Sequence, residues 1–344
     1  MNISLIGIDV AKDVFEVRYE DCSGNKVEGG SVRRGRLIEH ITKRAKGCRL
    51  AMEACGSSHY WAKELTALGF SVVMISPQFV KPYRKSQKND VNDAEAICIA
   101  ARQPGMRFVA AKGSEQLLIQ ALHRSRERFV RDRTALINQT RGLLLEHGLY
   151  IERGVSAFKK KVPMILNAGG PEMLIRLLQI HWEHYLHLDG QVMQLTKALE
   201  GVFKTNESCR KIANVSGIGP ITATALISRV GNPANYKNGR SFAASLGLVP
   251  RQYSTGGKTV LGRITKQGDC YVRKLLIHGA RAVVRHAPRA KLHTQTSLWV
   301  ASLVERCGTN RAAVAMANKT ARHVWAILAG KKPRESAVAY QLAH

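Results

Sequence analysis

Acidic residues are scarce in this chain of 344 residues. It has 25 Asp and Glu against 53 Lys and Arg, which gives a formal net charge of +28. Lysine and arginine that neutralise phosphates release counterions, so this balance favours a nucleic acid as the partner. A solvated basic surface is the ordinary explanation of a single charged run, but here the positive charge is spread along the whole sequence.

Other features are absent. The seven cysteines form no C-x-x-C pair and are odd in number, which indicates reduced thiols and argues against a zinc site. No apolar run approaches the roughly 18 residues needed to span a bilayer. The first ten residues lack the basic region of a signal peptide. We therefore expect a cytoplasmic protein with no membrane partner, built from two or three domains.

Two of the few acids end apolar segments. Residues 3–10 and 48–53 are short and apolar, which predicts buried strands that carry Asp9 and Glu53. An ionised carboxylate in such a place is costly unless a cation or hydrogen-bond donors compensate it. The alternative for Asp9 is that it caps the turn that follows the strand. Glu53, taken alone, fits a functional and a structural role equally well.

A second pair of acids, Asp90 and Asp93, lies at the start of a helix predicted over 92–102. Residues three apart face the same side of a helix. The alternative is that they complement the helix dipole, since Asn92 and Glu95 have capping-box spacing. Four carboxylates around one point repel each other and suit a divalent cation such as Mg²⁺ or Mn²⁺. Basic residues that could hold phosphate lie beside them: Lys81, Arg84, Lys85 and Lys88.

These features predict an α/β domain over residues 1–112. Further strands are expected near 15–19, 27–32 and 71–75, so that a mixed sheet delivers acids to one edge. Residues 113–205 then predict two long helices, 114–148 and 172–203, separated by a break at 154–171. They would form an antiparallel coiled-coil arm or a dimerisation arm. The spacing of their apolar residues by itself indicates only that the helices pack against another element. The first helix carries candidate nucleic-acid contacts: Arg124, Arg128 and Arg131.

Residues 206–344 predict a mainly helical third domain. Val215 to Pro220 is a glycine-rich turn between two helices, a helix-hairpin-helix-like segment. The amides of Gly217 and Gly219 could approach phosphates there, or the turn could simply be tight. Helices are expected over 241–245 and 270–286, and Trp299 and Trp325 are expected to anchor the core.

A loop is expected over 247–262. Its only serine, Ser254, stands beside paired glycines and could be a nucleophile, although a polar turn explains the spacing as well. The basic residues around this loop are also candidate nucleic-acid contacts: Arg251, Lys258, Arg263 and Lys266.

Five motifs together resemble a known family. They are Gly7-Ile-Asp-Val-Ala-Lys12, Met52-Glu-Ala-Cys-Gly56, Lys88-Asn-Asp-Val-Asn-Asp-Ala94, Ser216-Gly-Ile-Gly219 and Leu246-Gly-Leu-Val-Pro-Arg251. In this order they resemble the DEDD insertion-sequence transposases, which are bridge-RNA-guided recombinases.

The resemblance implies a RuvC-like (RNase H-type) domain whose Asp9, Glu53, Asp90 and Asp93 bind Mg²⁺, a coiled-coil arm, and a C-terminal transposase domain with a nucleophilic serine. It implies DNA cleavage through a phosphoserine link, guided by a structured RNA of the element that pairs with donor and target DNA. It further implies a tetramer in which the acids of one subunit meet the serine of another.

In several relatives the serine lies two residues after the aromatic that matches Tyr253, where this chain has Thr255. We take the neighbouring Ser254 as the nucleophile. Two other functions are weighed against this one: a metal-only Holliday-junction endonuclease of the RuvC type, and a non-catalytic RNA-binding protein. The first needs the acids but not the serine, and the second gives no reason for the four acids.

Overall fold

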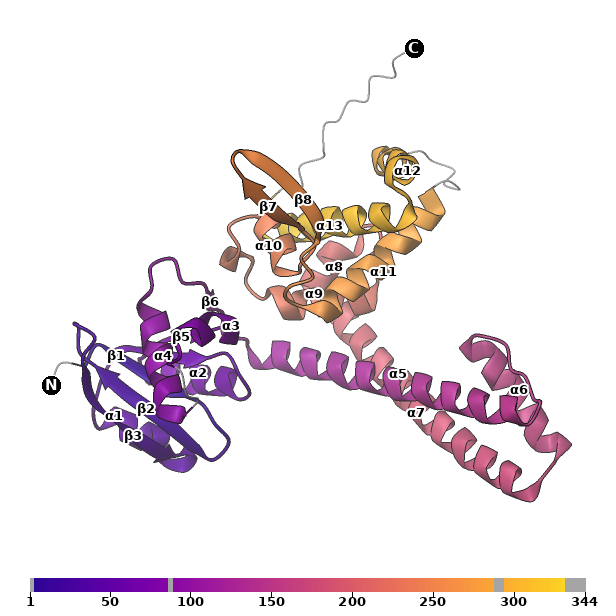
Figure 1. Ribbon diagram of the computed structural model, residues 1–344, viewed down its shortest axis with the longest axis horizontal. Coiled ribbons are helices and arrows are strands. Elements are labelled where there is room, and N and C mark those ends of the chain that lie inside the picture. Colours follow the sequence, from indigo (N-terminus) through magenta and orange to yellow (C-terminus); the bar gives the residue numbers. More distant parts are fainter. Residues whose placement is uncertain (1–2, 86–88, 288–293, 332–344) are drawn as a thin grey trace, which may run out of the picture. The chain divides into compact units, whose positions relative to one another are not determined.

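The computed structural model describes residues 3–85, 89–287 and 294–331 (Figure 1). The chain divides into two compact units, residues 1–113 and 114–344. The two long helices of the expected arm belong to the second unit, and its further division into an arm and a C-terminal domain stays a prediction. Among the described helices, none is both long and apolar enough to cross a membrane.

The first unit is built on a mixed sheet, as predicted, but the sheet has six strands. Five of them correspond to predicted strands, whereas β6 was not predicted. Strands β1, β4 and β5 run parallel, whereas β2, β3 and β6 pair antiparallel to their neighbours. The order across the sheet is β3-β2-β1-β4-β5-β6. The strands are β1 (Leu5–Asp9), β2 (Val14–Glu20), β3 (Lys26–Arg33), β4 (Arg49–Glu53), β5 (Ser71–Ile75) and β6 (Phe108–Val109).

Alternation along the strands gives the sheet two buried faces. Ile6 and Ile8 point into a core with Trp61 and Leu65 of α2. Leu5 belongs to the opposite core, which contains the apolar face of α4. The helices of this unit are α1 (Leu37–Thr42), α2 (Ser58–Ala67), α3 (Pro77–Val80) and α4 (Asp90–Arg102), with 3₁₀ turns η1 (Arg34–Arg36) and η2 (Lys81–Tyr83).

Gly7 lets α4 lie close to β1. A Cβ at this position would be 2.3 Å from the Cys98 sulfur and 2.8 Å from the Ala94 carbonyl oxygen. No side chain fits between strand and helix here, so the glycine sets the separation of the two elements. Because Gly7 and Asp9 point to the same face of β1, this contact brings the start of α4 toward Asp9.

In the second unit, helices α5 (Ser114–Glu146) and α7 (Glu172–Thr205) lie side by side and run antiparallel (Figure 1). Arg126 donates to Thr196 and, farther along α5, Thr140 contacts His181, so increasing numbers on one helix meet decreasing numbers on the other. The break expected at 154–171 is mostly a helix, α6 (Val155–Ala168), which contains Pro163. Its Phe158 and Val162 are buried in an apolar core that also contains residues of the two long helices.

The remaining elements of this unit enclose a second apolar core, which includes Trp325 at 7% exposure. Trp299 is only partly buried against this core, so it is a weaker anchor than predicted. The elements are α8 (Glu207–Ala213), α9 (Pro220–Val230), η3 (Pro233–Asn235), α10 (Gly239–Ser245), β7 (Pro250–Thr255), β8 (Lys258–Ile264), α11 (Cys270–His286), α12 (Gln295–Cys307) and α13 (Thr309–Leu328).

The loop expected over 247–262 is a β-hairpin, which corrects that prediction. Strands β7 and β8 are joined by Gly256 and Gly257, both with positive φ (+55° and +77°). Two positive φ angles are what a type I′ two-residue turn requires, and glycine adopts them without strain. Figure 1 shows the hairpin extending from the helices of its unit.

Candidate active site

Asp9 and Glu53 end two neighbouring parallel strands. The register between β1 and β4 pairs Ile8 with Met52, so the two acids follow side by side at the carboxyl ends of the strands. Both belong to the face that α4 covers, because Leu5 and Ala51, which share their parity, are buried in the core beneath that helix. The sequence pattern is therefore sufficient to bring these two acids together.

Asp90 and Asp93 are in the first turn of α4, as predicted, but the capping residue is different. The helix begins at Asp90 rather than near Asn92, and the side chain of Asn89 accepts a hydrogen bond from the Asn92 amide at 2.7 Å. The capping-box explanation based on Asn92 is thus wrong. Asn89 caps the helix, and Asp90 and Asp93 both lie in its first turn, so their position also suits the alternative that they complement the helix dipole.

Carboxylate oxygens of Asp9, Asp90 and Asp93 lie within 4.8 Å of one another. Burial, followed by the charges of Asp93, Asp90 and Glu53, raises the pKa of Asp9 to about 6, and Arg84 acts in the opposite direction. Mutual repulsion of this kind is relieved by a divalent cation, and carboxylate oxygens are the ligands such ions prefer. Glu53 lies outside the close group of three, although its charge is near enough to affect Asp9.

The basic segment beside the acids is partly engaged with them. Arg84 forms an ion pair with Asp93, and Lys85 forms one with Glu95 at 2.8 Å. Lys81 is exposed at the start of η2. The predicted contact Lys88 lies outside the described residues. Arg84 and Lys85 therefore have partners within the first unit in addition to the phosphate role predicted for them.

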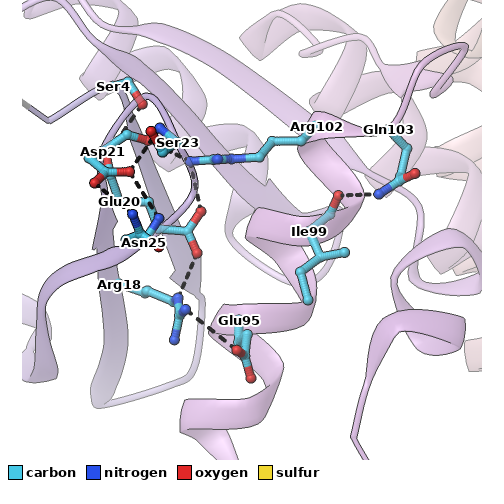
Figure 2. Close-up of polar contacts among 10 residues, drawn as sticks. All are labelled: Ser4, Arg18, Glu20, Asp21, Ser23, Asn25, Glu95, Ile99, Arg102 and Gln103. Carbon is cyan, nitrogen blue, oxygen red and sulfur yellow. Dashed lines mark hydrogen bonds and ion pairs between the residues drawn. The ribbon is translucent and has the colours of Figure 1, made fainter.

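A chain of ion pairs fixes α4 to β2 (Figure 2). Arg18 lies between Glu20 at 2.7 Å and Glu95 at 3.4 Å, and Arg102 reaches Glu20 from the other end of the helix at 3.0 Å. Glu20 is only 3% exposed. Charged pairs in so buried a place hold their elements in one register, because separating them leaves an uncompensated buried charge. No sequence pattern indicates this network, since its members are far apart in the chain.

Ser254 lies on the exposed hairpin of the second unit. Side chains alternate between the two faces of β7, so Ser254 shares a face with Gln252 and its cross-strand partner Thr259, whereas Thr255 points to the other face. Gln252 Nε2 donates a hydrogen bond to Ser254 Oγ at 2.8 Å. Sequence reasoning missed Gln252, although Gly-Gly between two polar runs is a hairpin signal that would have placed residues 252 and 254 together.

The other predicted nucleic-acid contacts are distributed over the second unit. Arg124, Arg128 and Arg131 are exposed on α5, where Arg128 pairs with Asp132 at 2.8 Å. The described basic residues of the hairpin region are also exposed: Arg251, Lys258, Arg263 and Lys266.

The glycine-rich turn joins α8 to α9, as predicted. Gly217 (φ +85°) packs against the backbone of Gly279 in α11, where a Cβ would be 3.0 Å from the Gly279 carbonyl. This contact gives Gly217 a packing role. At Gly219, in contrast, a Cβ would meet nothing within 4 Å, so crowding inside the described chain does not require glycine there.

Two family models match the sequence. Residues 6–148 match "Transposase" (DEDD_Tnp_IS110), and residues 209–295 match "Transposase IS116/IS110/IS902 family". The chain is 44% identical over 332 residues to the "Probable family 20 transposase" of Pseudomonas aeruginosa, covering 95% of this chain and 97% of that protein. It belongs to the IS110/IS116 family of transposases.

Two further relatives agree with this assignment. The "Transposase for insertion sequence element IS1111A" of Coxiella burnetii is 41% identical, with 95% of this chain and 90% of the relative covered. The "Transposase for insertion sequence element IS1328" of Yersinia enterocolitica is 38% identical, with 95% and 97% covered. As an IS110-family transposase the protein acts on DNA, and its DEDD domain implies use of a divalent metal, for which the cluster of Asp9, Asp90 and Asp93 is a suitable donor set.

Proposed function

We propose that this transposase cleaves and exchanges DNA strands through a phosphoserine intermediate, with Mg²⁺ (or Mn²⁺) at the acids and Ser254 as nucleophile. The observation that carries the proposal is that the same chain has a three-carboxylate cluster in its first unit and an exposed, hydrogen-bonded serine in its second. A metal site alone suffices for hydrolysis. A serine near the end of an exposed hairpin strand adds the means for a covalent link.

The acids would hold the metal through Asp9, Asp90 and Asp93, with Glu53 beside them. When bound, the metal would polarise the scissile phosphate and stabilise charge that develops on its oxygens. Ser254 Oγ forms the new bond to phosphorus and loses its proton, while the bond from phosphorus to the 3′ oxygen breaks and that oxygen takes up a proton. Rejoining is the reverse step, with a 3′ hydroxyl from another strand attacking the phosphoserine.

The fold of the first unit supports a RuvC-like assignment. Three antiparallel strands are followed by parallel strands, and the acids lie at the ends of β1 and β4 and at the start of the helix that covers them. We further propose that the acids of one subunit act with Ser254 of another in a dimer or tetramer, with the α5–α7 pair as a coiled-coil arm.

We also propose that a structured RNA encoded by the element selects the DNA. Support comes from the net charge of +28, which exceeds what a single short duplex contact requires. If base pairing to RNA reads the sequence, the protein needs only to hold backbone and duplex shape. Strand exchange that proceeds equally well without RNA would contradict this part of the proposal.

The test of the chemistry uses three variants with donor and target DNA and the RNA. Ser254→Ala and Asp9→Asn should each abolish strand transfer, and wild type should yield a covalent protein–DNA adduct. Thr255→Ala is the matched control, because this side chain points to the opposite face of β7. It should retain the adduct.

The metal-only junction endonuclease gives a different pattern: Asp9→Asn is inactive, Ser254→Ala still nicks, and no adduct forms. The family assignment argues against the third alternative, a non-catalytic RNA-binding protein.

A further inference from the structure

The last part of the chain is almost free of acids. From residue 208 to residue 344 the sequence has three, Asp269, Glu305 and Glu335, against 22 Lys and Arg. Helix α13 contains none. A polar recess among these helices is therefore suited to an anion, since there is little negative charge nearby to satisfy its donors.

Such a recess lies between the α8–α9 turn, the first turn of α12 and the middle of α13. It has a volume of about 190 Å³. Two apolar side chains contribute to its wall, and no carboxylate does. Its hydrogen-bonding residues come from three separate segments of the second unit: Asn214, Ser216, Thr296, Lys319, Thr320 and His323.

Lys319 supplies the charge of the pocket. Its ammonium lies 4.6 Å from the centre of the Trp299 ring, a cation–π contact that holds the side chain in place. No acidic side chain forms an ion pair with it in the described part of the chain. Burial and the charge of Arg322 lower the pKa of Lys319. A bound anion would stabilise the charged form of Lys319 against both effects.

The α8–α9 turn adds a backbone donor. The amide of Val215 donates to the Ile212 carbonyl at the end of α8, and the amide of Ile218 donates to the Val215 carbonyl, whereas the amide of Ser216 has no acceptor among the described residues. The contact of Gly217 with Gly279 fixes the turn against α11, so this amide is held at the pocket rather than free to reorient. Fixed backbone amides beside a cation are a common way to bind phosphate.

We propose that this pocket binds one phosphate of a nucleic-acid backbone, with Lys319 as its charge and Ser216, Thr296 and His323 as its hydrogen-bonding groups. The contact would be independent of base sequence and would position nucleic acid on the second unit. It requires neither Ser254 nor a metal, so it stands apart from the proposed chemistry.

The test measures equilibrium binding of the full chain to duplex DNA and to a structured RNA across a series of salt concentrations. Lys319→Ala should weaken binding about tenfold and reduce the slope of log K against log salt by about one. The matched control is Lys331→Ala, since Lys331 also lies over a tryptophan ring (Trp325, 5.1 Å) but does not line the pocket. It should change affinity much less.

Two additional arms make the result decisive. Thr296→Asp places a carboxylate in the pocket and should weaken binding at least as much as Lys319→Ala, and melting curves of both variants establish that they fold. A loss confined to DNA or to RNA identifies which backbone is bound. Equal effects of Lys319→Ala and Lys331→Ala, or binding of inorganic phosphate alone with unchanged nucleic-acid affinity, would overturn the proposal.

Discussion

The guanidinium of Arg84 contacts the carboxylate of Asp93, so a cation of the chain itself lies against one of the three clustered acids. Asp93 is 5% exposed, and Arg84 acts against the rise in the pKa of Asp9. The side chain therefore compensates part of the charge that a metal would neutralise.

Replacing this arginine should alter metal affinity. In Arg84→Gln the competing cation is gone, and we expect the acids to bind Mn²⁺ about tenfold more tightly, which corresponds to about 1.4 kcal/mol. Calorimetric titration of the full chain measures this directly. The control is Lys85→Gln, whose partner Glu95 is not among the clustered acids. Unchanged or weaker binding in Arg84→Gln would show that the arginine does not compete with the metal.

Gln252 should act as a positioning residue for Ser254. Its Nε2 donates to the serine oxygen, so it orients the hydroxyl and favours its ionised form. We expect Gln252→Ala to slow adduct formation about tenfold in single-turnover experiments and to shift the pH–rate profile to higher pH. A merely structural role would lower the rate without moving the profile. Gln252→Asn provides a conservative comparison, expected to be intermediate.

Gly279 should tolerate no side chain. A Cβ there would be 2.0 Å from the Gly217 carbonyl oxygen, so Gly279→Ala forces the α8–α9 turn away from α11 and should cost about 1–3 kcal/mol of unfolding free energy. Gly142 is the matched control. Like Gly279 it lies within a helix, but it is exposed and an added Cβ would have nothing within 4 Å. Gly142→Ala should stabilise the protein by about 0.5–1 kcal/mol. Chemical denaturation of both variants tests the difference.

The side chain of His123, in α5, forms hydrogen bonds to residues of α9 and α11. Thr224 Oγ1 donates to the Pro220 carbonyl at 2.8 Å, so it accepts from His123 Nε2–H, and Nδ1 then accepts from Tyr271. This arrangement requires a neutral ring. Burial and the charge of Arg126 lower the pKa of His123 to about 4, while Asp269 opposes them.

The sign of the resulting pH dependence follows from this pKa. His123 is protonated near pH 6.5 in the unfolded chain and only near pH 4 in the folded chain. The contribution of its neutral ring to the free energy of unfolding is therefore complete above pH 6.5 and is lost as the pH falls toward 4. It amounts to about 3 kcal/mol at most. His123→Gln should show a flatter decline of stability between pH 6.5 and 4 than wild type. Parallel curves for the two proteins would contradict the assignment.

The first unit could be predicted well because its signals are local. Strands β1, β4 and β5 are short apolar runs, and parallel strands necessarily deliver their last residues to one edge, which places Asp9 beside Glu53. Helix α6 and the β7–β8 hairpin were missed for the opposite reason. Gly and Pro residues bound or interrupt α6, and β7 is exposed along its whole length, so it has no apolar alternation to detect.

By itself, the sequence determined the charge, the acids at the ends of the strands and the order of the motifs, because these depend on residue type and spacing alone. Only the tertiary structure decided which groups meet. It placed Arg84 on Asp93, Gln252 on Ser254 with Thr255 turned away, and Lys319 beside the turn at Ser216. Such contacts depend on side-chain direction and on the approach of distant segments, as at Gly7 and Gly279, where the lack of one Cβ sets how closely a helix can pack.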